Sequence, residues 1–169
     1  MIKHNYSLLS HNSFGFDIKA DTFVDYSTEA ELIDFLRHNN AKDTPLLHIG
    51  GGNNLLFTGN FAGTVLHSSI KDISVTDETD DSITLRVGSG VVFDDLCRYT
   101  VEHNIGGLEN LSLIPSEVGA AAIQNIGAYG TEIKDLITKV DTIEIATGKR
   151  RTFTAAECMY GYRNSIFKT

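Results

Sequence analysis

Three consecutive glycines interrupt an apolar segment of this chain, and they constrain its fold more than any other feature. The segment, Leu46 to Phe57, reads LLHIGGGNNLLF. Glycine loses more conformational freedom on folding than other residues do, so three in a row indicate backbone that turns sharply or approaches another group closely. Short apolar runs bounded by glycine and polar residues are typical of buried strands. We therefore expect strands over 45–49 and 63–70, with a glycine loop between them.

Helices are predicted on both sides of this loop. Thr28 and Glu31 have the spacing of a capping box, and apolar residues follow them at helical intervals, which predicts a helix over 28–38. A second amphipathic pattern predicts a helix over 93–103, and we expect the glycines at 106–107 to end it.

Alternating segments predict two hairpins in the rest of the chain. The first covers 72–90, around an acidic turn, and the second covers 139–154, around ATGK. Between them, a proline followed by small residues predicts a short, closely packed helix within 115–125. Thr154 and Glu157 repeat the capping-box spacing, so we expect another short helix after residue 154.

Composition excludes several classes of function. The chain has 169 residues and a formal net charge of −8, which disfavours nucleic-acid binding because such proteins present a basic face to the phosphates. No apolar run is long enough to cross a bilayer, and the first residues lack the apolar core of a signal peptide. We therefore expect a cytoplasmic protein with neither a nucleic-acid partner nor membrane insertion.

Metal and disulfide sites are not expected either. Cys97 and Cys158 lie far apart and belong to no cluster with metal-ligand spacing, so buried reduced thiols are the favoured interpretation. The acidic residues of the first hairpin are most simply a solvated turn, because nothing makes their carboxylates converge on a cation.

The glycine loop has two remaining interpretations. A Walker loop would need Lys and Ser or Thr after Gly52, where Asn53 and Asn54 stand, and a dinucleotide fingerprint would need glycine in place of Leu55. A nest of backbone amides can bind a diphosphate without any basic side chain. The alternative is a turn that only allows two segments to pack closely.

A second glycine-rich segment favours the diphosphate. Residues 107–130 read GLENLSLIPSEVGAAAIQNIGAYG, and their small side chains would let backbone amides approach a large flat ligand. Close internal packing is the alternative use of such residues. Two glycine-rich segments together favour an extended dinucleotide.

These segments resemble those of a family of bacterial flavoenzymes. HIGGGNNLLF, NLSLIPSEVGAAAIQNIGAYG and YGYRNSIFK are similar to segments of UDP-N-acetylenolpyruvoylglucosamine reductases, also called UDP-N-acetylmuramate dehydrogenases, and HNSFGFD resembles the family's opening. The resemblance covers essentially the whole chain. It implies an α+β fold of the vanillyl-alcohol-oxidase (PCMH) type, with two small lobes over about 1–70 and 71–169 and non-covalent FAD between them.

The resemblance also implies roles for particular residues. In the family NADPH reduces FAD, and the flavin delivers hydride to the enolpyruvyl double bond of UDP-N-acetylglucosamine enolpyruvate, giving UDP-N-acetylmuramate for peptidoglycan. Arg163 matches the catalytic cation on the substrate carboxylate, and Tyr162 beside it is expected to pack near or orient the substrate. Leu55 extends the pyrophosphate loop. The residues that match the cofactor site are Gly50, Gly51, Gly52, Asn53, Asn54, Leu55, Ser112, Pro115, Gly119, Ala120, Ile123, Ile126, Gly127 and Tyr129.

Departures from the family pattern limit these expectations. The family's proton-donating serine and second catalytic acid lie in substrate-binding and C-terminal regions that we expect outside this chain, so Ser165 and Glu157 do not take those roles. Asn53 and Ser116 replace a usual serine and a usual glycine. We therefore expect a catalytically incomplete FAD-binding domain. The alternatives are a non-catalytic FAD-binding module and a flavin-dependent oxidase of the same fold.

Overall fold

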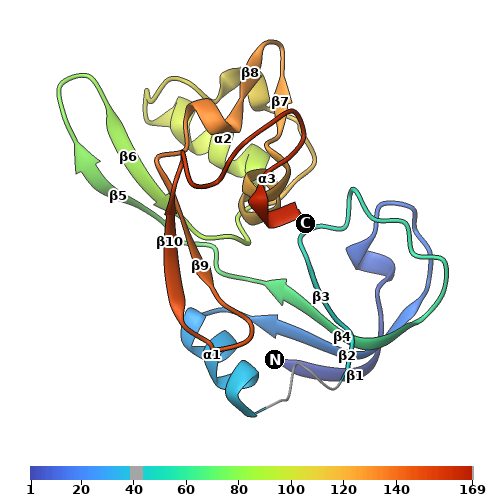
Figure 1. The fold of residues 1–169 in the computed structure, drawn as a ribbon. Helices are drawn as coiled ribbons and strands as arrows, with labels where there is room; N and C mark the ends of the chain where they lie inside the picture. The colour runs from blue at the N-terminus through green and yellow to red at the C-terminus, as the bar shows by residue number, and fades with distance from the viewer. Residues whose placement is uncertain (39–43, 169) are drawn as a thin grey trace. The chain divides into compact units, whose positions relative to one another are not determined.

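The computed structural model describes residues 1–38 and 44–168, which form two compact units (Figure 1). Unit 1 contains Met1–Ile70 and Ile143–Arg151. Unit 2 contains Lys71–Thr142 and the chain from Thr152 onward.

Unit 1 is built on a four-stranded sheet with one helix. The strand order is β1-β2-β4-β3, in which β1 is antiparallel to β2, whereas β2, β4 and β3 are parallel. The glycine loop connects β3 to β4, as expected. The elements are β1 (Ile2–Ser7), η1 (Leu9–His11), β2 (Lys19–Tyr26), α1 (Glu29–His38), β3 (Leu46–Ile49) and β4 (Phe61–Ser68).

The sheet of unit 1 has an apolar cluster on each face. Successive side chains of a strand point to opposite faces, and the central strands β2 and β4 follow this rule. Phe23 and Val65 belong to one cluster, and their neighbours Val24 and Leu66 belong to the other, which also contains Phe35 of α1. Burial on both faces fixes the strand register, because a slip by one residue would exchange the faces.

Helix α1 begins as the sequence predicts. The backbone amide of Glu31 donates to Thr28 Oγ1 over 3.1 Å, and the Glu31 carboxylate accepts from the Ser27 amide over 2.7 Å. Arg150 forms an ion pair with Glu29 of this helix at 2.7 Å. Because of such contacts, segment 143–151 groups with unit 1, although we expected the second lobe to include it.

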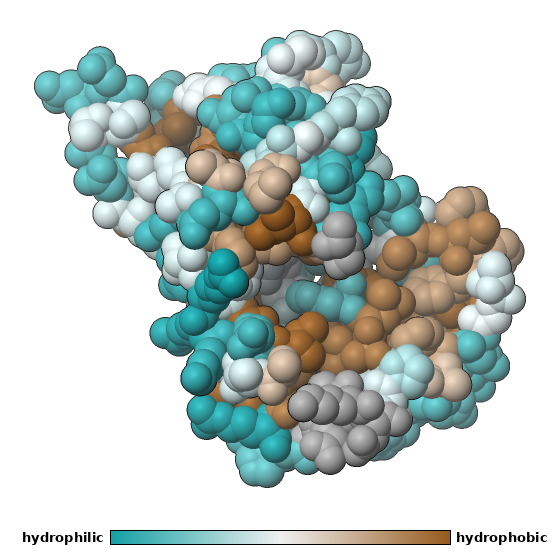
Figure 2. Space-filling model, in the orientation of Figure 1, coloured by the Kyte–Doolittle hydropathy of each residue, from teal (hydrophilic) through white to brown (hydrophobic). Residues whose placement is uncertain are grey.

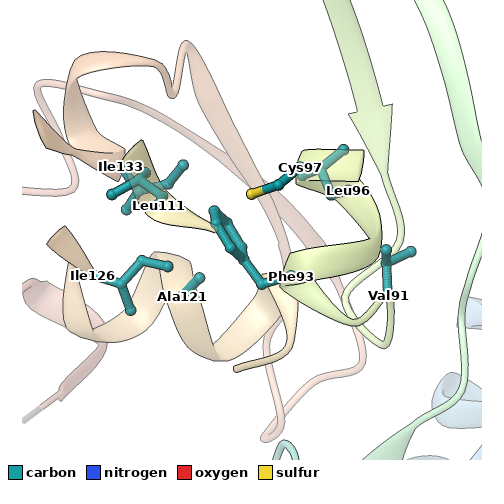
Figure 3. Close-up of a cluster of buried hydrophobic side chains, with 8 residues drawn as sticks. All are labelled: Val91, Phe93, Leu96, Cys97, Leu111, Ala121, Ile126 and Ile133. Atoms are coloured by element: carbon teal, nitrogen blue, oxygen red, sulfur yellow. The ribbon is translucent and has the colours of Figure 1, made fainter. Parts of the chain in front are cut away.

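Unit 2 packs two helices over a single core. Helices α2 (Phe93–Glu102) and α3 (Val118–Gln124) and the 3₁₀ turns between and after them supply most of its buried side chains, and Val91 and Ile126 supply the rest (Figure 3). Phe93 lies 1% exposed at the start of α2, and its ring is in the middle of the cluster. The described elements are β5 (Ile73–Glu78), β6 (Ile83–Val87), α2 (Phe93–Glu102), η2 (Glu109–Leu111), α3 (Val118–Gln124), β7 (Gly127–Ala128), β8 (Thr131–Glu132), η3 (Ile133–Asp135) and η4 (Ile166–Lys168), with β9 (Lys139–Ile143) and β10 (Arg150–Thr154) forming the second hairpin.

One local prediction is wrong, and the helix predicted over 93–103 is confirmed but is not ended by the expected glycines. The capping-box bonds of Thr154 and Glu157 form, but residues 155–159 make only a turn, which ends at Met159 with a left-handed φ of 46°. Helix α2 ends before the glycines at 106–107, because Asn104 already adopts a left-handed φ of 58°. Asparagine tolerates this conformation better than most residues.

No helix in the described part of the chain is long and apolar enough to cross a membrane.

Candidate functional site

Close packing within unit 1 explains why position 52 of the glycine loop is a glycine. Its φ is +68°, and a Cβ atom at this position would lie 1.9 Å from the carbonyl oxygen of His11. The Gly52 carbonyl accepts a hydrogen bond from the Ser13 amide over 3.3 Å. Any side chain here would therefore collide with the 11–13 backbone, so close packing, the alternative interpretation of the loop, accounts for this glycine.

The same loop presents backbone donors to a ligand. Among the hydrogen bonds of residues 1–38 and 44–168, none is donated by the backbone amides of Gly51, Gly52 or Asn53. Unpaired amides in succession are the donors that a nest offers to an anion. The loop therefore fits a diphosphate, because it can supply these donors without a basic side chain. Leu55, by contrast, packs against the apolar cluster of Phe23 and Val65.

Exposed apolar side chains lie on the segments before β2 and after the glycine loop. Phe14, Phe16 and Leu56 are 58%, 46% and 61% exposed, and Figure 2 shows hydrophobic surface over these loops. A cavity of about 480 Å³ is lined by residues 16–18 and 56–59. The two phenylalanine rings stack at 6.2 Å. The surface near the unpaired amides is thus suited to a ligand with an apolar part.

In unit 2, Asp94 fixes the predicted cofactor residue Ser112. Its carboxylate accepts hydrogen bonds from Ser112 Oγ and from the Leu113 amide, each over 2.7 Å. The bond from the Leu113 amide and the bond from Ser112 both lower the pKa of Asp94. Leu113 is held in a left-handed conformation with φ of 62° and is 83% exposed. Sequence reasoning did not identify Asp94, which lies outside the family-like segments, or Leu113, which lies within one of them but has an apolar side chain that suggests no contact.

Some of the predicted cofactor residues in and around α3 pack inside unit 2, and others are exposed. The Gly119 amide donates to Ser89 O over 2.9 Å, and a Cβ on Gly119 would lie 2.9 Å from Ser89 Cβ. The Ile126 side chain is 1% exposed within the core, so only its backbone could contact a ligand. Ile123 is 37% exposed, and Pro115 is exposed too. Ala120 is partly buried.

Tyr129 and Tyr162 expose large aromatic surfaces. They are 89% and 85% exposed, and Tyr129 adopts a left-handed φ of 51° after Gly127 and Ala128. Left-handed conformations in residues other than glycine are strained, and such strain clusters at functional sites. The backbone of unit 2 therefore holds the Tyr129 ring at a local energetic cost.

Arg163 lies in a tight turn that contacts Gly127, a residue predicted to belong to the cofactor site. Gly161 and Asn164 exchange two backbone hydrogen bonds, of 3.0 and 3.1 Å, across Tyr162 and Arg163. Arg163 has φ of 51° and donates from Nη2 to Gly127 O over 2.8 Å. The structure therefore brings Arg163 and Gly127 together within unit 2. The glycine loop belongs to unit 1.

Charged neighbours surround this turn. Lys134 pairs with Glu132, and this bond chiefly lowers the pKa of Glu132 and raises the pKa of Lys134. The Arg163 guanidinium also lowers the pKa of Glu132. Lys168 Nζ donates to Arg163 O over 2.7 Å. The surroundings of Arg163 therefore contain both signs of charge.

The remaining polar candidates have structural partners. Ser165 is 2% exposed and donates to Ile123 O over 2.6 Å, whereas Glu157 bonds to Thr154. His67 bonds to Asp25 within unit 1. No group of three metal-ligating side chains occurs in the described ranges. Cys97 and Cys158 are free and buried, which agrees with the prediction of buried thiols.

Relatives of the chain support the resemblance seen in the sequence. A reductase from Bacteroides fragilis, UDP-N-acetylenolpyruvoylglucosamine reductase, is 53% identical over 167 residues, which cover 99% of this chain and 50% of the relative. The enzyme of that name from Porphyromonas gingivalis is 46% identical over 167 residues, covering 99% and 49%. The resemblance to this family is confirmed, and the chain spans about half the length of these relatives.

Solved structures confirm the expected α+β fold. The UDP-N-acetylenolpyruvylglucosamine reductase of Thermus caldophilus has a TM-score of 0.76 at 22% identity, covering 98% of this chain and 56% of that one. The 6-hydroxy-D-nicotine oxidase of Arthrobacter nicotinovorans has a TM-score of 0.68 at 16% identity, covering 93% and 36%. The family described as FAD binding domain matches residues 20–154. The chain belongs to the FAD binding domain family.

Proposed function

We propose that this chain is the FAD-binding part of a reductase of peptidoglycan synthesis. The reductase converts UDP-N-acetylglucosamine enolpyruvate to UDP-N-acetylmuramate with NADPH as the hydride donor. Relatives that carry this name are 53% and 46% identical to the chain, which supports the assignment. We place the activity in the cytoplasm, where NADPH and UDP-linked sugars are made.

One observation carries the cofactor part of the proposal. The backbone amides of Gly51, Gly52 and Asn53 donate no hydrogen bond to any described residue, although Gly52 is buried. Polar groups in buried backbone normally have partners, so the unused donor of the buried Gly52 is unusual, whereas Gly51 is half-buried and Asn53 is exposed. All three amides are free to donate to a ligand with several acceptors. The diphosphate of FAD provides such acceptors.

The residues of unit 2 would serve the rest of the flavin nucleotide and the substrate. FAD, when bound, would supply the redox chemistry of the reaction. Ser112, fixed by Asp94, and the backbone near Gly127 would contact the nucleotide. Arg163 would pair with the substrate carboxylate and stabilise the negative charge that develops beside it. Its guanidinium suits this role because it is permanently charged and binds carboxylates through two parallel hydrogen bonds.

An absorbance spectrum of the purified chain, followed by a titration with FAD, tests the proposal. We expect flavin bands, or saturable FAD binding with the cofactor released intact on heating. ADP should compete with FAD because it also carries a diphosphate, whereas riboflavin should compete poorly. A folded chain that binds neither FAD nor ADP would contradict the cofactor assignment. Equal competition by riboflavin would contradict the role of the glycine loop.

A further inference from the structure

Asn125 stands out among the polar residues of unit 2 because it is completely buried. It follows α3 directly, is 0% exposed and adopts a left-handed conformation with φ of 47° and ψ of 64°. Its position alone would suit glycine, which commonly ends helices in this conformation. A buried amide side chain needs hydrogen-bond partners, so the partners of Asn125 show what the side chain does.

Both ends of the Asn125 amide are used. Nδ2 donates to Gly161 O over 2.8 Å, and Oδ1 accepts from the Lys134 amide over 3.1 Å. The Asn125 side chain also contributes to the lowered pKa of the Glu132 carboxyl, after the larger effect of Lys134. One buried residue thus connects the end of α3 to the turn that begins at Gly161 and to η3.

The turn that Asn125 contacts needs such support. Arg163 sits in the left-handed region, which residues other than glycine adopt only when the surrounding structure holds them there. Asn125 anchors the turn before Arg163, at Gly161, and Ser165 anchors it afterwards by donating to Ile123 O over 2.6 Å. The guanidinium bond to Gly127 O completes the attachment.

We propose that Asn125 is a positioning residue, which holds the left-handed turn so that the Arg163 guanidinium faces its carboxylate ligand. The functional meaning of this inference rests on the proposed role of Arg163, but the attachment itself does not. Asparagine is suited to the position for two reasons. It tolerates the left-handed conformation, and its short amide carries a donor and an acceptor at once.

Two variants separate this role from packing. In Asn125→Asp, the side chain can still accept from the Lys134 amide, and its ionised form cannot donate to Gly161 O because a carboxylate has only acceptors. Burial favours the protonated form, which keeps a donor, so exchange is compared over a range of pH to separate the two forms. In Asn125→Gly, the left-handed backbone remains favourable and both side-chain bonds are lost. Asn104→Gly is the matched control, since Asn104 also ends a helix of unit 2 with a left-handed φ of 58° and is exposed.

Amide hydrogen exchange, followed by NMR on the whole chain, is the measurement. We expect Asn125→Asp to reduce protection of the Gly161 and Asn164 amides at least tenfold while the Lys134 amide stays protected. Asn125→Gly should expose all three amides, and Asn104→Gly should change none of them. The Nε–Hε group of Arg163 should become disordered in both Asn125 variants.

The result that overturns the proposal is protection of Gly161 and Asn164 within twofold of the wild type in a folded Asn125→Asp variant. If neither variant folds, the wild-type chain still decides the question. A scalar coupling across the hydrogen bond between Asn125 Nδ2 and the Gly161 carbonyl carbon supports the attachment, and its absence overturns it. These readouts need neither FAD nor substrate, so a failure of the proposed function would be recognised separately.

Discussion

The Arg163 guanidinium donates a hydrogen bond to the carbonyl oxygen of Gly127 over 2.8 Å, although 36 residues separate them in the chain. This bond joins the turn that carries Arg163 to the segment predicted to contact the cofactor. A guanidinium has five N–H donors, so one bond to the backbone orients the group and leaves donors for a carboxylate. The arrangement suits the proposed role of Arg163, in which a fixed guanidinium pairs with a carboxylate.

Replacing Arg163 with lysine should separate charge from geometry. In a protein of the relatives' full length, which includes the substrate-binding region, we expect Arg163→Lys to weaken binding of UDP-N-acetylglucosamine enolpyruvate about tenfold or more, because lysine cannot bind a carboxylate through two parallel bonds. Isothermal titration calorimetry measures the affinity. The control is Arg98→Lys, which alters an exposed arginine paired with Asp95 on α2. Equal affinities for both variants and the wild type would exclude Arg163 from the carboxylate site.

Two glycines with the same backbone angle test the packing of the glycine loop. Gly52 and Gly15 both have φ of +68°, but a Cβ on Gly15 would meet nothing within 4 Å, whereas one on Gly52 would collide with His11 O. Gly15→Ala should therefore cost only the left-handed strain, about 1 kcal/mol. Gly52→Ala should cost at least about 3 kcal/mol and reduce FAD affinity, because the 11–13 backbone must move.

Urea-induced unfolding measures the stability of both variants. Similar losses at the two positions would mean that the loop does not pack against the 11–13 backbone.

The lowered pKa of the Asp25 carboxyl predicts that the stability of unit 1 depends on pH. Burial raises the pKa of this carboxyl, but hydrogen bonds from Ser69 and His67 outweigh burial and lower it overall. A carboxyl whose pKa is lower in the folded state stabilises the fold above its unfolded pKa, and this contribution is lost as the pH falls through the folded pKa.

Asp25→Asn should therefore destabilise the chain by roughly 1 kcal/mol near neutral pH, a small value because solvent screens a partly exposed group. The difference from the wild type should shrink as the pH falls from about 5 to 3. Urea unfolding over this range measures it, with Asp21→Asn, an exposed position on β2, as the control. A difference that stays constant with pH would contradict the assigned hydrogen bonds.

The two thiols should be unreactive in the folded chain. Burial is the largest cause that raises the pKa of Cys97 to about 11, and burial also raises the pKa of Cys158. Since the thiolate is the reactive form, a disulfide reagent at pH 8 should modify neither thiol quickly in the native state. Both should react within minutes in concentrated urea. Rapid labelling without denaturant would show that α2 or the 155–159 turn opens readily.

Local patterns predicted many elements because their causes are local. The Thr28 capping box and the apolar spacing behind it define α1, and alternation around acidic residues defines the β5–β6 hairpin. The capping box at Thr154 shows the limit of this reasoning. Its hydrogen bonds form, yet no helix follows, because a cap cannot supply the packed apolar face from which a short helix gains most of its stability.

The sequence by itself determined the family, the position of the glycine loop and the expectation of unpaired cysteines, because these follow from residue identity and order. Only the tertiary structure decided what each residue of those segments touches. Gly52 is required because the His11 backbone occupies the place of its side chain, and Asn125 matters because folding buries it against Gly161. Such contacts join residues distant in the chain, so no local pattern encodes them.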